Sequence, residues 1–149
     1  MIAGDQEKEA AMSDLVRMSL SLEKPLLDRL EAMVARSQYT NRSEFIRDMI
    51  RRQMVDQEWQ TNEEAVGTIT LVYDHHARTL SKKLTELQHR HHHAILASTH
   101  VHLTHDTCVE MILVRGPADQ IRQIADLLRG QKGVLHAALS TSSTGKRLV

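Results

Sequence analysis

The sequence has few of the residues that mark several common protein classes. Its single cysteine excludes an internal disulfide and is typical of a reducing compartment. Only four aromatic side chains occur in 149 residues, so any core must be built mainly from Leu, Ile, Val and Met. No apolar run approaches the ~20 residues that span a bilayer, and the acidic N-terminus lacks the apolar segment of a secretory signal. We therefore expect a cytoplasmic protein that has no membrane partner.

The sequence has no excess of charge of either sign, because 19 basic residues balance 19 acidic ones. With no global field to attract nucleic acid, any DNA binding must come from a local surface. The length allows one ordinary domain or two small ones. Residues 1–14 combine four acidic side chains with one lysine and little apolar content, so we expect a flexible N-terminal arm there.

Residues 15–22 alternate between apolar and polar side chains. This period of two predicts a short strand with one buried face. Arg17, Ser19 and Ser21 share the polar face of that strand.

Two amphipathic helices follow the strand. Pro25 suits the first turn of the first helix, and Asn41 or Ser43 can cap the second, with Asn41 and Glu44 at capping-box spacing. A lone strand with two such helices cannot satisfy its backbone groups or complete a core. We therefore expect an intertwined dimer in which the two strands pair and present their polar face outward.

A two-stranded ribbon of this kind fits the DNA major groove, where Arg reads guanine bidentately and hydroxyl groups donate or accept hydrogen bonds. The alternative is that the three polar residues form only the solvated face of an edge strand. The segment VRMSLSLEKPLLDRLEAMVARSQYTNRSEFIRDMIRR resembles a ribbon-helix-helix DNA-binding domain, to which we assign residues 15–57. This resemblance implies that the start of the second helix lies against a DNA phosphate, at Asn41, Arg42 and Ser43.

The hydrophobic period changes after a polar stretch at residues 58–65, which we interpret as a linker. Residues 66–149 then show strands and helices in the order βαββαβ, at 66–73, 77–88, 95–103, 108–114, from 116 onward, and 133–139. This order predicts a ferredoxin-like antiparallel sheet with both helices on one face, followed by a frayed tail at residues 140–149. The fold class expected for the whole chain is therefore α+β.

Residues 89–108 hold seven of the ten histidines and the only cysteine. A hairpin centred on His105 pairs His102 with Cys108 and His100 with Glu110, about 4.5–5.5 Å apart. His100, His102 and Cys108 then share one face as candidate metal ligands, and Glu110 is a candidate outer acceptor for His100. The alternative is a solvated, histidine-rich turn.

The same parity puts four apolar residues of the hairpin on the opposite face, which we expect to lie against the helices: Val101, Leu103, Val109 and Met111. The metal face also carries Ile112 and Val114, which should not face water. We expect a partner subunit to cover it, so the metal site should lie near an oligomer interface. His89 is the candidate for a fourth ligand.

The pattern H-R-H-H-H, then H-V-H, then Cys is similar to that of the nickel-responsive repressor family (NikR), over roughly residues 15–140. The resemblance implies an ACT-like tetrameric core flanked by ribbon-helix-helix dimers. It implies planar Ni(II) bound by His100, His102 and Cys108 of one subunit and His89 of another. It also implies a homotetrameric repressor of nickel-uptake genes that binds a palindromic operator.

The donor set by itself suits nickel, copper or zinc, so a related repressor that senses copper or cobalt remains an alternative. A zinc enzyme would need an open coordination position and a nearby general base. Neither the H-E-x-x-H nor the H-x-x-E-H pattern occurs, so we do not expect an enzyme.

Two further groups of residues are candidates for weaker sites. Glu44 and Asp48 lie at i and i+4 of the second helix, and in the family the matching acids hold a hard cation such as potassium. The alternative is that they are ordinary acids near a helix start. The remaining histidines could bind additional metal or be plain surface residues: His75, His76, His91, His92, His93, His105 and His136.

Overall fold

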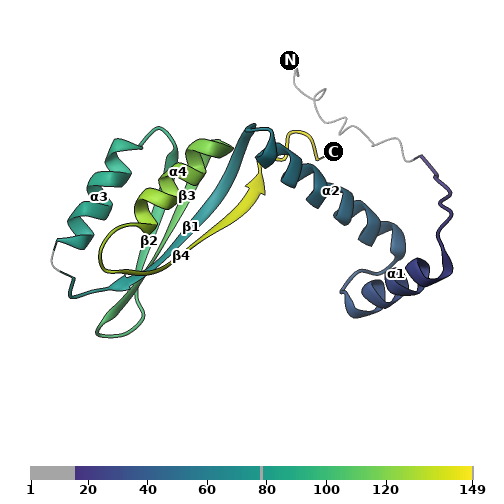
Figure 1. The fold of residues 1–149 in the computed structure, drawn as a ribbon, viewed down its shortest axis with the longest axis horizontal. Coiled ribbons are helices and arrows are strands. Elements are labelled where there is room, and N and C mark those ends of the chain that lie inside the picture. Colours follow the sequence, from purple (N-terminus) through teal and green to yellow (C-terminus); the bar gives the residue numbers. More distant parts are fainter. Residues whose placement is uncertain (1–15, 78, 149) are drawn as a thin grey trace, which may run out of the picture. The chain divides into compact units, whose positions relative to one another are not determined.

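The protein is described from a computed structural model, which covers residues 16–77 and 79–148. The expected acidic arm and Leu15 lie outside these residues. The elements, in chain order, are α1 (Lys24–Arg36), α2 (Arg42–Gln60), β1 (Glu64–Asp74), α3 (Leu80–Arg90), β2 (Ile95–His102), β3 (Thr107–Pro117), α4 (Ala118–Arg129) and β4 (Val134–Ser143) (Figure 1). Within these ranges no helix is both long enough and apolar enough to cross a membrane. The chain divides into two compact units at Arg47/Asp48, within α2.

The N-terminal unit has the two expected helices but little core. Residues 16–23 form no hydrogen-bonded strand within the chain, and Val16, on the expected buried face, is 88% exposed. No residue of α1 is buried. The helices begin where the sequence predicts: Pro25 lies in the first turn of α1, and Asn41 Oδ1 accepts a hydrogen bond from Glu44 N at 3.0 Å. This unit therefore leaves open the apolar surface that the expected strand pairing would cover.

The C-terminal unit is a four-stranded sheet with the strand order β2-β3-β1-β4, in which every neighbouring pair is antiparallel. Helices α3 and α4 lie on one face of it (Figure 1). The βαββαβ order and the α+β class are therefore confirmed. The tail is shorter than expected, because β4 continues through Ser143, which pairs with Ala65 of β1.

The core lies between the sheet and the two helices. Ile69 and Leu71 of β1 are fully buried there, and every second residue of β3 joins them. The helices contribute their apolar stripes, which are buried in the same cluster: Leu80, Leu84, Leu87, Ile121, Ile124 and Leu128.

The prediction of which hairpin residues share a face is correct, but the choice of the covered face is wrong. Cys108, Glu110, Ile112 and Val114 are buried on the helix side. The residues expected against the helices lie on the open side, where Val101, Leu103 and Met111 are exposed and Val109 is partly buried. The physical reason is the pairing of β3 with β1, because it continues the buried row of Ile69 and Leu71 through Ile112 and Glu110.

The polar stretch at residues 58–65 is mostly regular structure, because α2 extends to Gln60 and β1 begins at Glu64. Trp59 is buried, and its Nε1 donates to Ser142 O at 2.8 Å. Arg122 Nη2 donates to Trp59 O at 2.7 Å, and its guanidinium carbon lies 5.4 Å from the centroid of the indole. The end of α2 is thus fixed to the C-terminal unit. How the chain divides into independently folding domains stays a prediction.

Candidate metal centre

The β2–β3 hairpin sets the positions of the candidate ligands. Its register pairs His102 with Cys108, Val101 with Val109 and His100 with Glu110, which confirms the predicted pairing. The turn is closed by Leu103 N donating to Thr107 O at 2.9 Å. Thr104 Oγ1 also accepts from the backbone N–H of Asp106 and of Thr107, at 3.2 and 3.1 Å.

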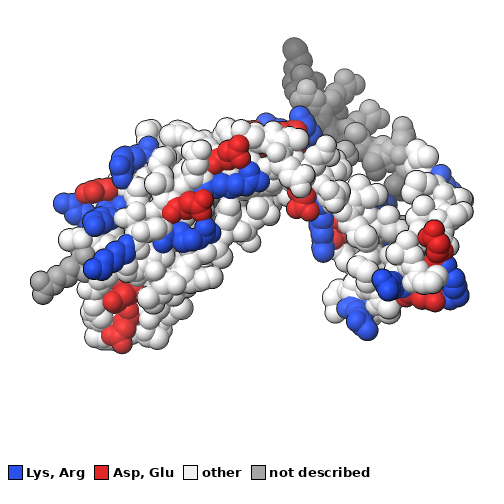
Figure 2. All heavy atoms as spheres, in the orientation of Figure 1, with Lys and Arg blue, Asp and Glu red and all other residues white. Residues whose placement is uncertain are grey.

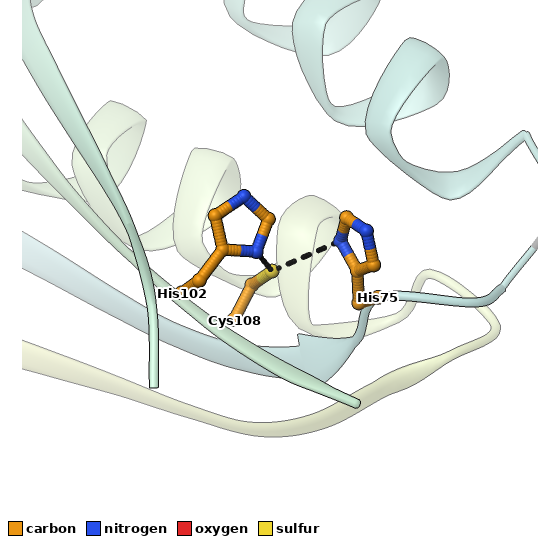
Figure 3. Close-up of side chains that lie close together, drawn as sticks. All are labelled: His75, His102 and Cys108. Atoms are coloured by element: carbon orange, nitrogen blue, oxygen red, sulfur yellow. Dashed lines mark hydrogen bonds between the residues drawn. The ribbon is translucent and has the colours of Figure 1, made fainter. Parts of the chain in front are cut away.

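The Cys108 thiol is the centre of a cluster of ligand atoms. Its Sγ lies 3.3 Å from His102 Nδ1 and 3.3 Å from His75 Nδ1 (Figure 3). The ligand atoms of all three residues lie within 4.8 Å of one another. Cys108 is buried while both histidines are exposed, so the thiol closes the inner side of the cluster and the imidazoles form its outer side.

The two sulfur–nitrogen distances are compatible with a metal ion bound to Cys108 and an imidazole. Zinc lies about 2.3 Å from a thiolate sulfur and about 2.0–2.1 Å from an imidazole nitrogen, which places sulfur and nitrogen about 3.1 Å apart at a right angle and about 3.5 Å apart at the tetrahedral angle. The two observed separations of 3.3 Å lie between these limits. One thiolate and two imidazoles are donors suited to nickel, copper or zinc.

Of the four expected nickel ligands, His102 and Cys108 are in contact. His100 lies beside them: its ring centroid is 4.8 Å from that of His102, and it stacks on Tyr73 at 6.0 Å. His89 is exposed in the last turn of α3. The full set of His89, His100, His102 and Cys108 stays a prediction.

His75 enters the cluster although the sequence suggested only a weak secondary role for it. The register of β1 against β3 pairs Tyr73 with Cys108, so the chain leaves β1 beside the thiol and His75 follows two residues later. The signal that could have identified it is a histidine directly after a strand that neighbours the metal hairpin.

Glu110 is buried beneath the cluster and connects three elements. It accepts hydrogen bonds from Gln88 Nε2 of α3 at 2.7 Å and from Tyr73 Oη of β1 at 3.5 Å. Burial and the Glu110 charge raise the pKa of Tyr73 to about 12. These contacts are with Gln88 and Tyr73, and the expected role of Glu110 as an acceptor for His100 stays a prediction. Because Gln88 precedes His89, Glu110 links the hairpin to the end of α3.

Burial raises the pKa of the Cys108 thiol above its usual value, and the charge of Glu110 raises it further. The thiol is therefore protonated at neutral pH in the metal-free protein. A metal ion that binds the thiolate must displace this proton, so metal affinity should fall as the pH is lowered.

A second group of possible ligands lies next to the first, at the tip of the hairpin. His76 Nε2 is 2.9 Å and His105 Nδ1 is 3.0 Å from Asp106 Oδ1. Hydrogen bonds from His105 and His76 lower the pKa of Asp106. All three side chains are exposed, so the group is a surface cluster of mixed donors.

The candidate potassium ligands are paired with arginines of their own helix. Glu44 forms an ion pair with Arg47, and Asp48 Oδ2 lies 2.7 Å from Arg52 Nη2. These pairs offset the repulsion between two like charges at i and i+4.

The candidate DNA-contacting residues lie on accessible surface. Arg17, Ser19, Ser21 and Ser43 are exposed. Arg42 is exposed too and forms an ion pair with Glu31 at 2.8 Å, while Asn41 caps α2. Positive and negative side chains are mixed over the visible face of each unit, so that face carries no broad basic patch (Figure 2).

A Glu110→Gln substitution is expected to lower the pKa of the Cys108 thiol in the metal-free protein, because it removes a buried negative charge. The pKa should remain above the usual thiol value, since burial is unchanged. The pH dependence of thiol alkylation measures this. Glu86→Gln removes an exposed charge from α3 and serves as the control; equal profiles for both variants would contradict the role given to Glu110.

Two family profiles match the chain. The NikR C-terminal nickel-binding domain matches residues 66–142, and the ribbon-helix-helix protein, copG family, matches residues 16–57. Proteins from Solibacter usitatus and Geobacter sulfurreducens, each provisionally named nickel-responsive regulator, are both 46% identical to it over 138 residues, which is 92% of this chain and 99% of theirs. An uncharacterized Thermotoga maritima protein of known structure has a TM-score of 0.48 and 16% identity, covering 53% of this chain and 98% of its own, a likeness too slight to support an inference. The chain belongs to the nickel-responsive regulator family, a family of transcription regulators and not of enzymes.

Proposed function

We propose that this protein is a cytoplasmic, nickel-dependent repressor that binds operator DNA and controls nickel-uptake genes. The observation that carries the proposal is the buried Cys108 thiol with His102 at 3.3 Å, in a chain that also has a ribbon-helix-helix segment. A metal at this thiol lies in the sheet unit, while the DNA-reading residues lie in the N-terminal unit. Nickel would therefore act as an allosteric ligand rather than by contacting DNA.

In this proposal Ni(II) is held in a plane by His100, His102 and Cys108 of one subunit and by His89 of another. The proposal is supported by the register that gathers the first three at one end of the β2–β3 hairpin. It is also supported by the exposure of His89, which leaves its imidazole free to reach a neighbouring molecule. The hydrogen bond from Gln88 to Glu110 then gives a physical route by which His89 binding restrains the end of α3.

The DNA-binding part of the proposal is an intertwined dimer whose paired strands present Arg17, Ser19 and Ser21 to the major groove. Two observations support the dimer: the apolar row of residues 16–22 is exposed, and no residue of α1 is buried. Apolar side chains in both segments would be buried by a second copy of the chain. The positive end of the α2 dipole would favour a phosphate beside Arg42 and Ser43, while the Glu44 N–H is capped by Asn41.

The oligomeric part is a homotetramer, a dimer of dimers, built on the open face of the sheet. Val101, Met111 and Leu113 lie on that face between 38% and 45% exposed. An apolar surface of this kind on adjacent strands is typical of an interface. A tetramer carries two ribbon dimers, which matches a palindromic operator with two half-sites. Nickel would favour the arrangement in which both dimers reach one duplex.

Potassium at Glu44 and Asp48 is part of the proposal only as a secondary site. Both carboxylates already pair with arginines of α2, so the ion would have to displace Arg47 and Arg52. A repressor that senses copper or cobalt is the second candidate, since the same donor atoms suit those ions.

A mobility-shift titration of operator-type DNA with Ni, Cu, Co and Zn tests the function. We expect nickel to raise the operator affinity of the protein by about 10- to 100-fold, and Cys108→Ala to lose this increase. His93→Ala, which removes an exposed histidine next to the ligand region, is the matched control and should respond like the wild type. An operator affinity that nickel leaves unchanged in the wild type would refute the proposal, and a stronger response to copper or cobalt would favour the second candidate.

Arg17→Ala is expected to weaken operator binding by roughly 5- to 150-fold, the range of one bidentate base contact, and to reduce discrimination against random DNA. Arg29→Ala removes the same charge from the exposed surface of α1 and should weaken operator and random DNA to a similar, small extent. Fluorescence anisotropy with both DNA sequences at one salt concentration makes the comparison. Equal loss of discrimination in both variants would mean that the strand does not read bases.

Met111→Lys should dissociate the tetramer to dimers, because it puts a charge in the centre of the open sheet face. Leu127→Lys is the control: Leu127 is exposed to almost the same degree as Met111, 46% against 45%, but lies on α4. Sedimentation equilibrium of the two variants gives their masses. A tetrameric Met111→Lys protein would rule out this face as the interface.

A further inference from the structure

Glu58 is a buried carboxylate in the last turn of α2, and neither the nickel ligands nor the DNA-reading residues use it. The residue is only 6% exposed, and its Oε2 atom is buried with no hydrogen-bond partner among the residues that the structure describes. A buried charged oxygen costs free energy unless it is paired with a donor or a cation. We propose that Glu58 is the principal ligand of a site for a hard divalent cation, separate from the candidate nickel and potassium ligands.

The chain turns back on itself after α2, which brings a second carboxylate to Glu58. Asn62 has the left-handed φ of 57°, and Glu63 N donates to Glu58 O at 2.9 Å. The turn leads directly into β1, whose other end carries Tyr73 opposite Cys108. At about 3.3 Å per residue, β1 separates Glu58 from the metal centre by roughly 30 Å.

The C-terminal segment after β4 completes the surroundings of Glu58. It returns along α2, where Arg51 Nε donates to Leu148 O at 3.1 Å (Figure 1). Two cavities lie where this segment meets the end of α2, and both have Glu58, Glu63 and Arg147 in their walls. The larger, of about 490 Å³, is also lined by Glu64, Thr144 and Lys146, and the smaller, of about 180 Å³, by Met54 and Gln57. All of these residues belong to the C-terminal unit.

The charges around the larger cavity leave one carboxylate unmatched. Glu63 forms an ion pair with Arg147, and Lys146 Nζ lies 3.1 Å from Glu64 Oε2. Glu58 forms no ion pair among the described residues, although it is the most deeply buried of the three glutamates. The negative end of the α2 dipole lies at the same place and adds to the local negative charge. The excess is therefore concentrated on an oxygen that water does not reach.

The donor atoms at this place favour a hard cation. The cavity walls offer carboxylate, hydroxyl and amide oxygens but neither a histidine nor a cysteine, so nickel, copper and zinc have no preferred ligand there. Calcium accepts about six to eight oxygen ligands in a flexible geometry, and magnesium keeps several waters beside one or two carboxylates. The larger cavity has room for an ion together with such waters. A divalent ion at Glu58 and Glu63 would balance the charge of both carboxylates.

The simpler alternative is that Arg147 itself satisfies Glu58. Its guanidinium has several N–H donors, and both cavities have it in their walls. A rotation from Glu63 toward Glu58 would pair it with the buried oxygen, and the chain would then fill the site without an ion. With a cation site, in contrast, Arg147 competes with the ion for Glu63. Removal of the arginine should then strengthen ion binding.

Terbium luminescence on the full chain, freed of metal, tests the site. Tb(III) is a probe of oxygen sites for hard cations, and Trp59, the only tryptophan, is the neighbour of Glu58 in the chain and can sensitise it by energy transfer. We expect saturable emission from the wild type that calcium displaces. Removing even an outer partner of a metal ligand costs about 10- to 100-fold in affinity, so Glu58→Gln should weaken Tb(III) binding at least about tenfold.

Three further variants make the result specific. Asp56→Asn removes an exposed carboxylate of the same helix two residues before Glu58 and should bind Tb(III) like the wild type. Asp48→Asn removes a candidate potassium ligand and should also leave the Tb(III) affinity unchanged. Arg147→Gln should raise this affinity, because it removes the competing cation from Glu63.

A wild-type protein without saturable emission would overturn the proposal in favour of the pairing of Glu58 with Arg147. A loss of affinity in Asp56→Asn or Asp48→Asn as large as in Glu58→Gln would overturn it as well. If Glu58→Gln does not fold, as judged by its thermal transition, Glu63→Gln replaces it at a less buried position and should weaken Tb(III) binding too. These measurements use neither nickel nor DNA, so they do not depend on the proposed function.

Discussion

The antiparallel pairing of β1 with β3 is the constraint on which the rest of the structure depends. It places Tyr73 opposite Cys108 and Leu71 opposite Glu110, so one register decides both the core and the metal-binding end of the sheet. Since side chains alternate along a strand, the register that buries Ile112 against the helices must also bury Cys108. The packing that stabilises the fold therefore also raises the pKa of the Cys108 thiol. A metal ion that binds the thiolate must displace the proton of this buried thiol, and burial makes that displacement more costly.

Glu110 carries this coupling from the sheet to a helix. A buried carboxylate is costly unless it is hydrogen-bonded, and its partners come from α3 and β1, through Gln88 and Tyr73. The end of α3 is thus held to the hairpin by a polar contact in addition to the apolar stripe of the helix. The Gln88–Glu110 hydrogen bond lies next to His89 and involves a charge that interacts with the thiol, whereas apolar packing has no such electrostatic interaction. The end of α3 is therefore linked to the state of Cys108 through Glu110.

The sequence was sufficient for the element order and for the hairpin register, because both follow from local patterns: periods of two and 3.6, and a turn centred on His105. It was not sufficient to choose the covered face of the hairpin. Val101 and Met111 on one side and Ile112 and Val114 on the other are equally apolar, and the choice depends on pairing with β1, about 40 residues earlier in the chain. His75 was undervalued for the same reason, since its contact with Cys108 spans 33 positions. Trp59 was placed in a linker because its neighbours are polar, although its own indole is buried.

Among the residues that the structure describes, apolar side chains are uncovered in residues 16–22 and α1 and on the open face of the sheet. Each of these two groups lies opposite a row of candidate functional residues. The apolar row of residues 16–22 is opposite their polar row, and the open face of the hairpin is opposite its histidine face. In an alternating strand this relation is unavoidable, because side chains that are neighbours in sequence point to opposite faces. A substitution that shifts a strand by one residue would therefore exchange its two faces. In the proposed assembly, ligand binding and subunit contact would therefore depend on the same strand register.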